Sequence, residues 1–259
     1  MIQYPQIDPE IFRIGPLAIR WYGLMYLMGF ISSMLLVRQQ ITKKKLVLGK
    51  DFVETLYSYL ILGLLLGGRL GYVILYNPAY YIEHPLEIPA IWQGGMAFHG
   101  ALAGTIIAGL LFCKKAGADM LLIADMISVT VPIGLGLGRI GNFINAELYG
   151  RVTDVPWAMI FPGEVLPRHP SQLYEFFLEG VVLFIILWVI RERVQKGTVT
   201  AMFLILYGIF RTVAEIFREP DVQIGYILGF LTMGQILSGI MILAGIGVYI
   251  AARKPKQGR

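Results

Sequence analysis

Long uncharged apolar segments dominate this chain and restrict what it can fold into. The runs 181–190 and 201–210 contain no charged residue. Of 259 residues, 56% are hydrophobic and only 15% are charged, whereas a soluble domain usually carries about 25% charged residues. Because about 20 mostly apolar residues span the hydrocarbon core of a bilayer as a helix, we expect an integral membrane protein.

The apolar stretches alternate with polar, proline-containing segments along the whole chain. This pattern predicts an all-α polytopic membrane protein with about seven transmembrane helices, forming a single integral membrane domain over residues 1–259. Segments near 77–95 and 147–172 are expected on the outer side, the second as a small external head. The expected spans are 17–37, 52–76, 96–113, 119–138, 173–190, 199–217 and 230–252.

Lysine and arginine are distributed unevenly between the loops, which predicts the orientation. By the positive-inside rule, the basic loops lie in the cytoplasm, so the N-terminus is expected outside and the C-terminus inside. The net charge of +5 needs no nucleic acid to explain it. The basic residues of the expected cytoplasmic side are Arg38, Lys43, Lys44, Lys45, Lys50, Lys114, Lys115, Arg191, Arg193, Lys196, Arg253, Lys254, Lys256 and Arg259. Those of the opposite side are Arg13, Arg20, Arg151, Arg168 and Arg218.

The chain contains few residues that bind metals or form disulfides. Cys113 is the single cysteine, which excludes an internal disulfide and a cysteine-based metal cluster. The three histidines, His84, His99 and His169, lack the spacing of metal ligands. We therefore expect no metal site and no cofactor.

Three arginines, Arg69, Arg139 and Arg211, lie inside or at the rim of the expected spans. A charge at bilayer depth costs at least about 2.5–3.5 kcal/mol, so it normally has a partner or a function. Arg69 follows two glycines and is explained equally well as a helix-packing charge or as a functional residue. Arg139 and Arg211 have more polar neighbours and are considered separately.

Arg139 lies in the glycine-rich segment 138–150, together with Asn142, Asn145 and Glu147. If the segment is helical, Arg139 and Asn142 share one face. The glycines at 134, 136, 138 and 141 allow close approach of another helix or of a ligand. A tightly packed helix with a snorkelling arginine explains Arg139 alone, but it leaves the other polar residues unexplained. We therefore favour a binding site.

Arg211 belongs to a polar stripe on an otherwise apolar helix. Tyr207, Arg211, Glu215 and Arg218 fall within about 80° at 100° per residue. An intrahelical ion pair between Arg211 and Glu215 is available. The second arginine one turn further exceeds what this pair needs, so an anion-binding cavity is the favoured interpretation.

The remaining polar residues admit structural explanations. Tyr22 and Tyr26 lie near the outer end of the first span, where tyrosine is a common interfacial anchor. Ser171 is a plausible N-cap for the fifth span, ahead of Glu175 and Glu179.

His99 lies between glycines at the outer end of the third span. A lone histidine is commonly structural, but histidine also suits proton abstraction near neutral pH. From spacing alone, both roles stay open. The residues by themselves thus predict an anion site near the outer leaflet, where phospholipid headgroups are abundant. A lipid-modifying enzyme and a transporter or flippase of an anionic lipid both fit.

Three longer segments narrow this choice, namely 94–100, 138–150 and 166–175. Together with 21–26 and the stripe of 207–218, they closely resemble the prolipoprotein diacylglyceryl transferases. The resemblance extends over nearly the whole chain. The stretch between Arg151 and Leu166 is shorter than is usual in that family.

The resemblance implies transfer of sn-1,2-diacylglyceryl from phosphatidylglycerol to the lipobox cysteine of a preprolipoprotein, with release of glycerol 1-phosphate. It implies a bacterial inner-membrane protein whose partners are phosphatidylglycerol, the lipobox signal peptide and the bilayer. A monomer is expected. Position by position, it assigns His99 as the base and Arg139 and Arg211 as phospholipid-binding arginines. It further assigns site positions to Tyr22, Asn142, Glu147, Gly150 and Glu215, with Gly150 among the residues that bind substrate.

Overall fold

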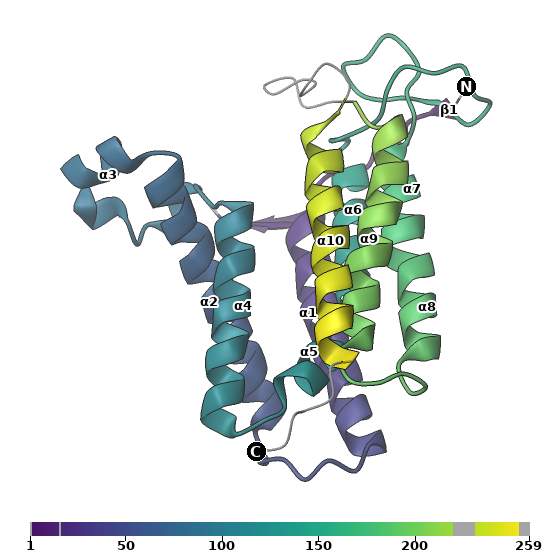
Figure 1. Cartoon of the computed structure of the whole chain (residues 1–259). Helices are drawn as coiled ribbons and strands as arrows, with labels where there is room; N and C mark the ends of the chain where they lie inside the picture. Colours follow the sequence, from purple (N-terminus) through teal and green to yellow (C-terminus); the bar gives the residue numbers. More distant parts are fainter. Residues whose placement is uncertain (1, 16, 220–230, 254–259) are drawn as a thin grey trace. The chain divides into compact units, whose positions relative to one another are not determined.

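The computed structural model describes residues 2–15, 17–219 and 231–253, and most of them are helical (Figure 1). Six helices or runs of consecutive helical segments in this part are long and apolar enough to cross a membrane. The expected class, an all-α polytopic membrane protein, is confirmed. The six are α1 (Trp21–Lys43), α2 (Phe52–Leu75), α5 (Met120–Ser128) with α6 (Val131–Ile144), α7 (Ser171–Glu175) with η3 (Phe176–Val182) and α8 (Leu183–Ile190), α9 (Thr198–Phe217), and α10 (Met233–Arg253).

The chain forms two compact units, which are described separately. Unit 1 contains Met1–Val37 and Ala124–Arg259, and unit 2 contains Arg38–Ile123. The last expected span began at residue 230, which lies outside the described residues. The remaining expected spans each coincide with a helix within a few residues at most ends.

The expected span 96–113 corresponds to α4 (Phe98–Ala116) of unit 2. It is not among the six apolar spans, because His99 near its start and Lys114 and Lys115 near its end lower its mean hydropathy. It nevertheless runs antiparallel to α2, with Gly104 against Gly63 and Ala97 hydrogen-bonded to Gly68. A crossing by α4, and hence the count of seven, stays a prediction.

Short strands precede the first span, where a helix start was expected. The span was predicted from residue 17, but Leu17–Arg20 forms β3 and pairs antiparallel with β2 (Glu10–Ile14). The helix begins only at Trp21. Farther towards the N-terminus, β1 (Ile2–Gln3) pairs in parallel with β4 (Met159–Ile160) of the expected external head. The N-terminal segment therefore lies beside residues 158–160.

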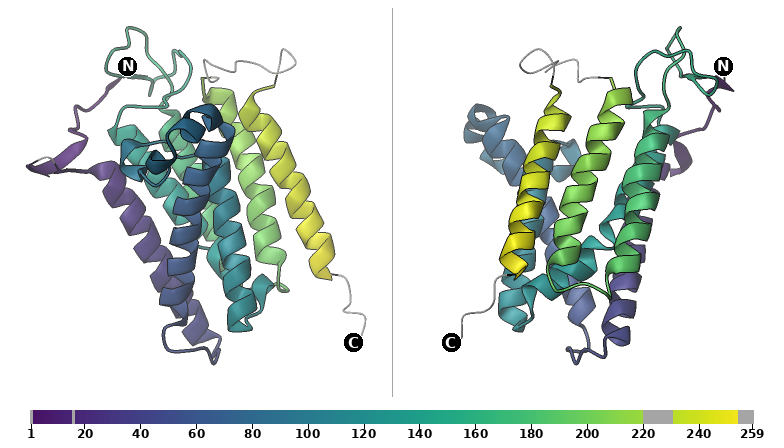
Figure 2. Two further views of the ribbon diagram at one scale, coloured as in Figure 1. Left: turned by 90° about the vertical axis from the view of Figure 1, so that its left-hand side faces the viewer. Right: turned by 45° about the vertical axis from the view of Figure 1, so that its right-hand side comes forward.

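The core of unit 1 is apolar around the ends of α8 and α9. Val129, Leu183, Leu187 and Val199 are each at most 1% exposed. Beside them, the carboxylate of Asp125 on α5 accepts hydrogen bonds from the N-terminal turn of α9, as a capping residue supplied by another helix. Its donors are Gly197 N at 2.7 Å and, at 2.8 Å each, Thr200 N and Thr200 Oγ1. Both views of Figure 2 show α9 beside α10.

Two glycines bring α6 and η3 into close backbone contact. A Cβ added to Gly180 would lie 2.8 Å from Gly136 Cα, and one added to Gly136 would lie 3.1 Å from Gly180 Cα. Only glycine permits this approach. The η3 stretch is π-helical, a geometry that is rare and often found near functional sites. Together these features bring Arg139 of α6 opposite two glutamates.

A second glycine interface joins α2 and α4 in unit 2. Gly63, Gly67 and Gly71 recur at every fourth position and face Gly100 and Gly104. A Cβ at Gly67 would lie 2.3 Å from Gly100 O and 2.7 Å from Gly104 Cα. Small residues at this spacing let membrane helices pack backbone to backbone. This interface was not predicted.

Candidate functional site

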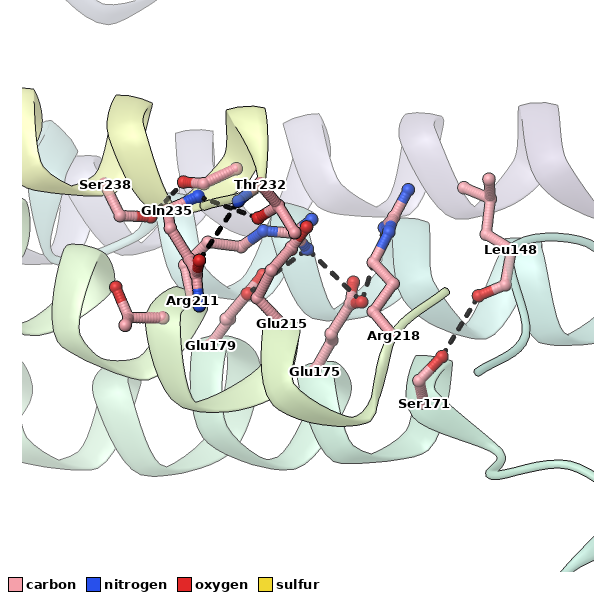
Figure 3. Close-up of polar contacts among 12 residues, drawn as sticks. Leu148, Ser171, Glu175, Glu179, Arg211, Glu215, Arg218, Thr232, Gln235 and Ser238 are labelled. Carbon is pink, nitrogen blue, oxygen red and sulfur yellow. Dashed lines mark hydrogen bonds and ion pairs between the residues drawn. The ribbon is translucent and has the colours of Figure 1, made fainter. Parts of the chain in front are cut away.

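The buried carboxylate of Glu175, on α7, lies at the centre of the polar site in unit 1 (Figure 3). Glu175 is 1% exposed and contacts three arginines. Its Oε2 lies 2.5 Å from Arg139 Nε of α6. Its Oε1 lies 3.2 Å from Arg211 Nη1 of α9 and accepts a hydrogen bond from Arg218 Nη1 at 3.4 Å. Glu175 thus connects three elements of unit 1.

Glu179 lies one turn beyond Glu175 and is fully buried. Its oxygens are 3.5 Å from Arg139 Nη2 and 3.9 Å from Arg211 Nη1. No hydrogen bond to either oxygen is found among the described residues. Buried charges without hydrogen bonds are costly. Glu179 is therefore the least satisfied member of the site.

The expected ion pair between Arg211 and Glu215 on α9 is present. Arg211 Nη2 lies 2.6 Å from Glu215 Oε2. The carboxylate of Glu215 packs on Gly234 at the start of α10, where an added Cβ would come within 2.7 Å of it. Thr232 and Gln235 cap α10 reciprocally, side chain to backbone, at 3.1 and 3.2 Å. The well-capped end of α10 thereby holds Glu215 against Arg211.

We call these six residues the Arg–Glu network: Arg139, Arg211, Arg218, Glu175, Glu179 and Glu215. Their formal charges cancel, because three guanidinium groups face three carboxylates. The second arginine on α9 had suggested a bound anion. In the structure, Glu175 of the neighbouring span supplies a negative charge to Arg218. The surplus charge that favoured an anion cavity is thus already balanced within the protein.

A strained turn after α6 orients Glu147. Ala146 and Leu148 on either side of it have φ values of +53° and +57°, which are uncommon for residues with a side chain. The Glu147 carboxylate accepts a hydrogen bond from Asn142 Nδ2 at 2.7 Å. Gln172 Nε2 donates to the Glu147 carbonyl at 2.7 Å. Strain of this kind often accompanies functional sites, and here it turns Glu147 back towards α6.

Tyr22 lies against α6. A Cβ at Gly141 would come within 2.7 Å of the Tyr22 ring, so glycine is needed for this contact. The Tyr22 hydroxyl is 3.1 Å from that of Tyr26. Three predicted site residues, Tyr22, Asn142 and Glu147, are therefore gathered at the end of α6.

Gly150 is tightly enclosed by protein. Its amide donates to the His169 carbonyl at 2.8 Å, and an added Cβ would lie 2.3 Å from Phe217 O. The observed role of Gly150 is close packing of the turn against α9. That Gly150 binds substrate stays a prediction.

Ser171, expected to cap the fifth span, is instead the first helical residue. Its hydroxyl donates to the Leu148 carbonyl at 3.1 Å, so it fastens the strained turn rather than capping the helix. This expectation was wrong because the cap position falls on Pro170. Ser171 and Gln172 thus each donate a side-chain hydrogen bond to the backbone of residues 147–148.

His99 belongs to unit 2, in the first turn of α4, and its side chain is exposed. Its ring contacts that of Phe98, with centroids 5.6 Å apart. Arg69 of the same unit is 4% exposed and donates to backbone carbonyls. These carbonyls belong to the segment 87–95, so Arg69 holds a loop against α2, which neither of its two interpretations had described.

Sequence reasoning missed the roles of Glu175 and Glu179. They had been treated as ordinary acidic residues in the first turns of a helix. One signal was available, since two glutamates four residues apart in an apolar span are as costly as the arginines. Considering acidic and basic charges at bilayer depth together would have paired them.

The arrangement is suited to holding a phosphate. Guanidinium groups match phosphate oxygens with two parallel hydrogen bonds. Arg139 and Arg211 come from different helices and both meet the same two carboxylates. An anion with several oxygens can take the place of a carboxylate between them.

Comparison with known proteins finds a matching family and several similar relatives. Residues 9–251 match the family model of prolipoprotein diacylglyceryl transferase. A phosphatidylglycerol–prolipoprotein diacylglyceryl transferase from Desulfotalea psychrophila is 56% identical over 254 residues, covering 95% of this chain and 93% of that protein.

Proteins of the same name from other bacteria are similarly close. The one from Bordetella parapertussis is 53% identical over 259 residues, covering 98% of this chain and 99% of its own. The one from Geobacter sulfurreducens is 49% identical over 259 residues, covering 99% and 100%. The similarity therefore extends over whole chains, including both units.

Proposed function

The chain belongs to the prolipoprotein diacylglyceryl transferase family, and we propose that its Arg–Glu network binds the phosphate of phosphatidylglycerol. It is a multi-pass membrane transferase that moves a diacylglyceryl group from phosphatidylglycerol to a prolipoprotein. Family membership does not favour the alternative of a lipid transporter. The observation that carries the proposal is the convergence of Arg139 and Arg211 on one buried pair of carboxylates.

The reaction requires stabilisation of a leaving phosphate. The thiolate sulfur of the lipobox cysteine forms a bond to the carbon of the diacylglyceryl moiety that carries the phosphate. The bond between this carbon and the phosphate oxygen breaks. Glycerol 1-phosphate leaves with added negative charge. Fixed arginines in a water-poor site stabilise this charge more than they stabilise the intact phosphodiester. Arg139 and Arg211 are the proposed donors.

Glu179 is proposed as an internal counter-ion that the lipid phosphate displaces. The network is neutral without lipid, so phosphate adds a negative charge to a balanced site. Glu179 has the longest contacts, 3.5 and 3.9 Å, and no hydrogen bond among the described residues. Loss of its contacts costs less than loss of those of Glu175. Glu215 and Glu175 then hold the arginines in place.

His99 is proposed as the base that removes the thiol proton. A cysteine thiol has an ordinary pKa near 8.5 and attacks as the thiolate. The substrate peptide supplies the nucleophile, so the enzyme needs no cysteine of its own. Tyr22, Asn142 and Glu147 are proposed to line the site at the end of α6, and Gly150 to contact substrate through its backbone.

The proposed setting is a bacterial inner membrane, with the N-terminus outside and the C-terminus in the cytoplasm. The excess of lysine and arginine in alternate loops supports this orientation. Both units are proposed to form one membrane domain that acts as a monomer on phosphatidylglycerol and lipobox peptides.

Purified protein in phosphatidylglycerol vesicles, incubated with a lipobox peptide, tests the activity by mass spectrometry. We expect the peptide to gain one diacylglyceryl group at its cysteine, with release of glycerol 1-phosphate. A peptide with serine in place of that cysteine is the control and should stay unmodified. Unmodified peptide and intact lipid in all reactions would contradict the transferase.

Glu179→Gln tests the counter-ion in the same assay. Because the variant removes a like charge next to the phosphate, we expect KM for phosphatidylglycerol to fall about tenfold or more. Glu54→Gln removes an exposed carboxylate paired with Arg38 and should leave KM unchanged. A raised KM in Glu179→Gln would show that Glu179 supports binding rather than competing with the lipid.

A further inference from the structure

Arg69 is a buried arginine whose hydrogen bonds to the described residues all go to main-chain carbonyls. In unit 2, Nε donates to Ile88 O at 2.6 Å, and Nη2 donates to Glu87 O at 2.7 Å. Nη1 donates to Gly94 O at 2.6 Å and to Gly95 O at 3.2 Å. None of the ion pairs found among the described residues involves Arg69. Its charge is therefore used to hold backbone rather than a carboxylate.

The donor geometry explains why an arginine occupies this position. The guanidinium group carries five N–H donors in a rigid plane, whereas a lysine has one nitrogen on a flexible stem. The planar group here reaches carbonyls on two sides of a loop at once. Hydrogen bonds from a charged donor are also stronger than neutral ones. Arg69 thus fastens residues 87–95 to α2 at both ends.

The segment that follows is held equally closely. Gly94 and Gly95 have φ values of +88° and +77°, a backbone region that favours glycine. A Cβ at Gly95 would lie 2.6 Å from the Tyr72 ring. Two residues later, Ala97 N donates to Gly68 O at 2.9 Å. The chain therefore reaches the start of α4 along a single, well-determined path.

His99 lies immediately after this path. Ala97 is the N-cap residue of α4, Phe98 begins the helix, and His99 is its second residue. The first turn of a helix has no preceding turn to hold it. Its position is therefore determined by the segment before it and by Gly100, which packs on Gly67 and Gly71.

We propose that Arg69 is a positioning residue for the transfer reaction, because its hold on residues 87–95 fixes the start of α4 and with it the imidazole of His99. The inference rests on the proposed role of His99 as base. Arg69 itself touches no reacting atom in this scheme. A misplacement of about 1 Å in a reacting group can cost about a hundredfold in rate.

Arg69→Lys and Arg69→Gln test this in the peptide assay. Both variants should lower kcat by about 10–100-fold, while KM for phosphatidylglycerol stays within about twofold, because the lipid is held in unit 1. Arg38→Lys is the matched control, since it changes an exposed arginine of the same unit and should keep normal kcat. A raised KM with normal kcat in the Arg69 variants would overturn the positioning role.

A double variant separates positioning from general damage. If Arg69 acts through His99, then Arg69→Lys combined with His99→Gln should be no more than about threefold slower than His99→Gln alone. Independent structural damage predicts that the two losses multiply. Multiplied losses would overturn the inference while leaving the base itself intact.

Hydrogen exchange provides a readout that does not depend on activity. In Arg69→Lys, amides of 87–101 should exchange faster than in the wild type, while those of α9 stay unchanged. Unchanged exchange over 87–101 would overturn the clamp. A fully active His99→Gln would instead overturn the role of His99 as base and with it the positioning role of Arg69. The exchange data would then test only whether Arg69 holds residues 87–95.

Discussion

Arg139 and Arg211 each contact two carboxylates through different nitrogens. A positive charge alone is therefore not enough at either position. Arg139 meets Glu175 through Nε and Glu179 through Nη2. Arg211 meets Glu175 through Nη1 and Glu215 through Nη2. Each side chain can therefore contact a phosphate with one nitrogen while another holds a carboxylate. A lysine has all its donors on a single nitrogen, so it cannot hold two anions in this fixed fork geometry.

Arg139→Ala and Arg211→Ala should each lower turnover by about 10²–10³-fold, the usual loss when one preorganised donor to a developing charge is removed. Lysine at either position should restore little of the rate. Thioether formation by purified, folded variants measures this. Arg38→Ala, which removes an exposed ion pair, is the control. Near-normal turnover of either site variant would remove that arginine from the proposed phosphate site.

His99→Gln keeps hydrogen-bonding capacity but removes basicity. If His99 is the base, the variant should lose about 10²–10⁴-fold at neutral pH. The loss should shrink as pH rises, because the peptide thiol then ionises unaided. Turnover at saturating phosphatidylglycerol is measured across pH for the wild type and the variant. A loss that stays constant at every pH would favour a structural role.

His169 predicts a pH dependence of stability outside the membrane spans. Its ring packs against Phe217, with Nδ1 3.1 Å from the Tyr174 hydroxyl. Burial lowers the pKa of His169, so the folded protein favours the neutral ring. Its contribution to stability is complete above the ordinary histidine pKa, near 6.5, and is lost as pH falls from there through the lowered pKa of the folded protein.

Thermal unfolding at pH 8 and pH 5.5 measures this contribution. The midpoint should fall on acidification in the wild type and fall less in His169→Gln, which cannot take up the proton. His84→Gln changes an exposed histidine in unit 2 and should behave like the wild type. An equal fall in wild type and His169→Gln would contradict the assignment.

At the scale of elements, glycines decide which helices meet. In unit 1, Gly136 and Gly180 bring α6 against η3, and this contact places Arg139 opposite the glutamates. In unit 2, α2 and α4 meet through Gly63, Gly67 and their partners. Glycine-rich helices were evident from the sequence, but the identity of each partner helix was not. Spacing along one helix does not specify the surface that it meets.

Gly67→Ala should destabilise unit 2, because its Cβ would lie 2.3 Å from Gly100 O and force the two helices apart. Overpacking of this kind typically costs about 1–3 kcal/mol. The matched control is Gly109→Ala on α4, whose Cβ would make an ordinary van der Waals contact with Leu60 at 3.5 Å. Alanine there is expected to be neutral or slightly stabilising.

Thermal unfolding in detergent compares the two variants. We expect a lower midpoint for Gly67→Ala and an unchanged or higher midpoint for Gly109→Ala. Equal midpoints would show that the α2–α4 contact can relax without cost.

At the scale of the whole molecule, the open question is which loops face the cytoplasm. Cys113 is the single cysteine and is buried near the end of α4. Cys113→Ser should keep full activity, because the nucleophile comes from the peptide. That variant also provides a cysteine-free background in which new cysteines report on the two sides of the membrane.

Two exposed positions distinguish the orientations. Val47, which is 100% exposed, lies in a basic loop, and Val165, which is 88% exposed, lies in the expected external head. In the cysteine-free background, a membrane-impermeant thiol reagent should label Val165→Cys in intact cells. It should label Val47→Cys only after permeabilisation. The reverse pattern would invert the proposed topology.

The class of protein, the approximate spans and most of the polar residues near the site could be predicted from the order of residues alone. Apolar runs of span length leave a chain little choice in a bilayer, since every backbone polar group must be satisfied within a helix. The polar stripe of α9 was also predictable, because helical periodicity relates residues on one helix. These features depend on local order along the chain.

The pairing of the charges, in contrast, depends on how the helices pack in the folded protein. Glu175 and Glu179 neutralise arginines from α6 and α9, and Arg69 holds a loop about twenty residues away. The turn at 145–150 owes its strained shape to ties from Ser171 and Gln172. Such contacts join residues far apart in sequence through close packing at glycines, and no periodicity along a single helix encodes which partner lies across the interface.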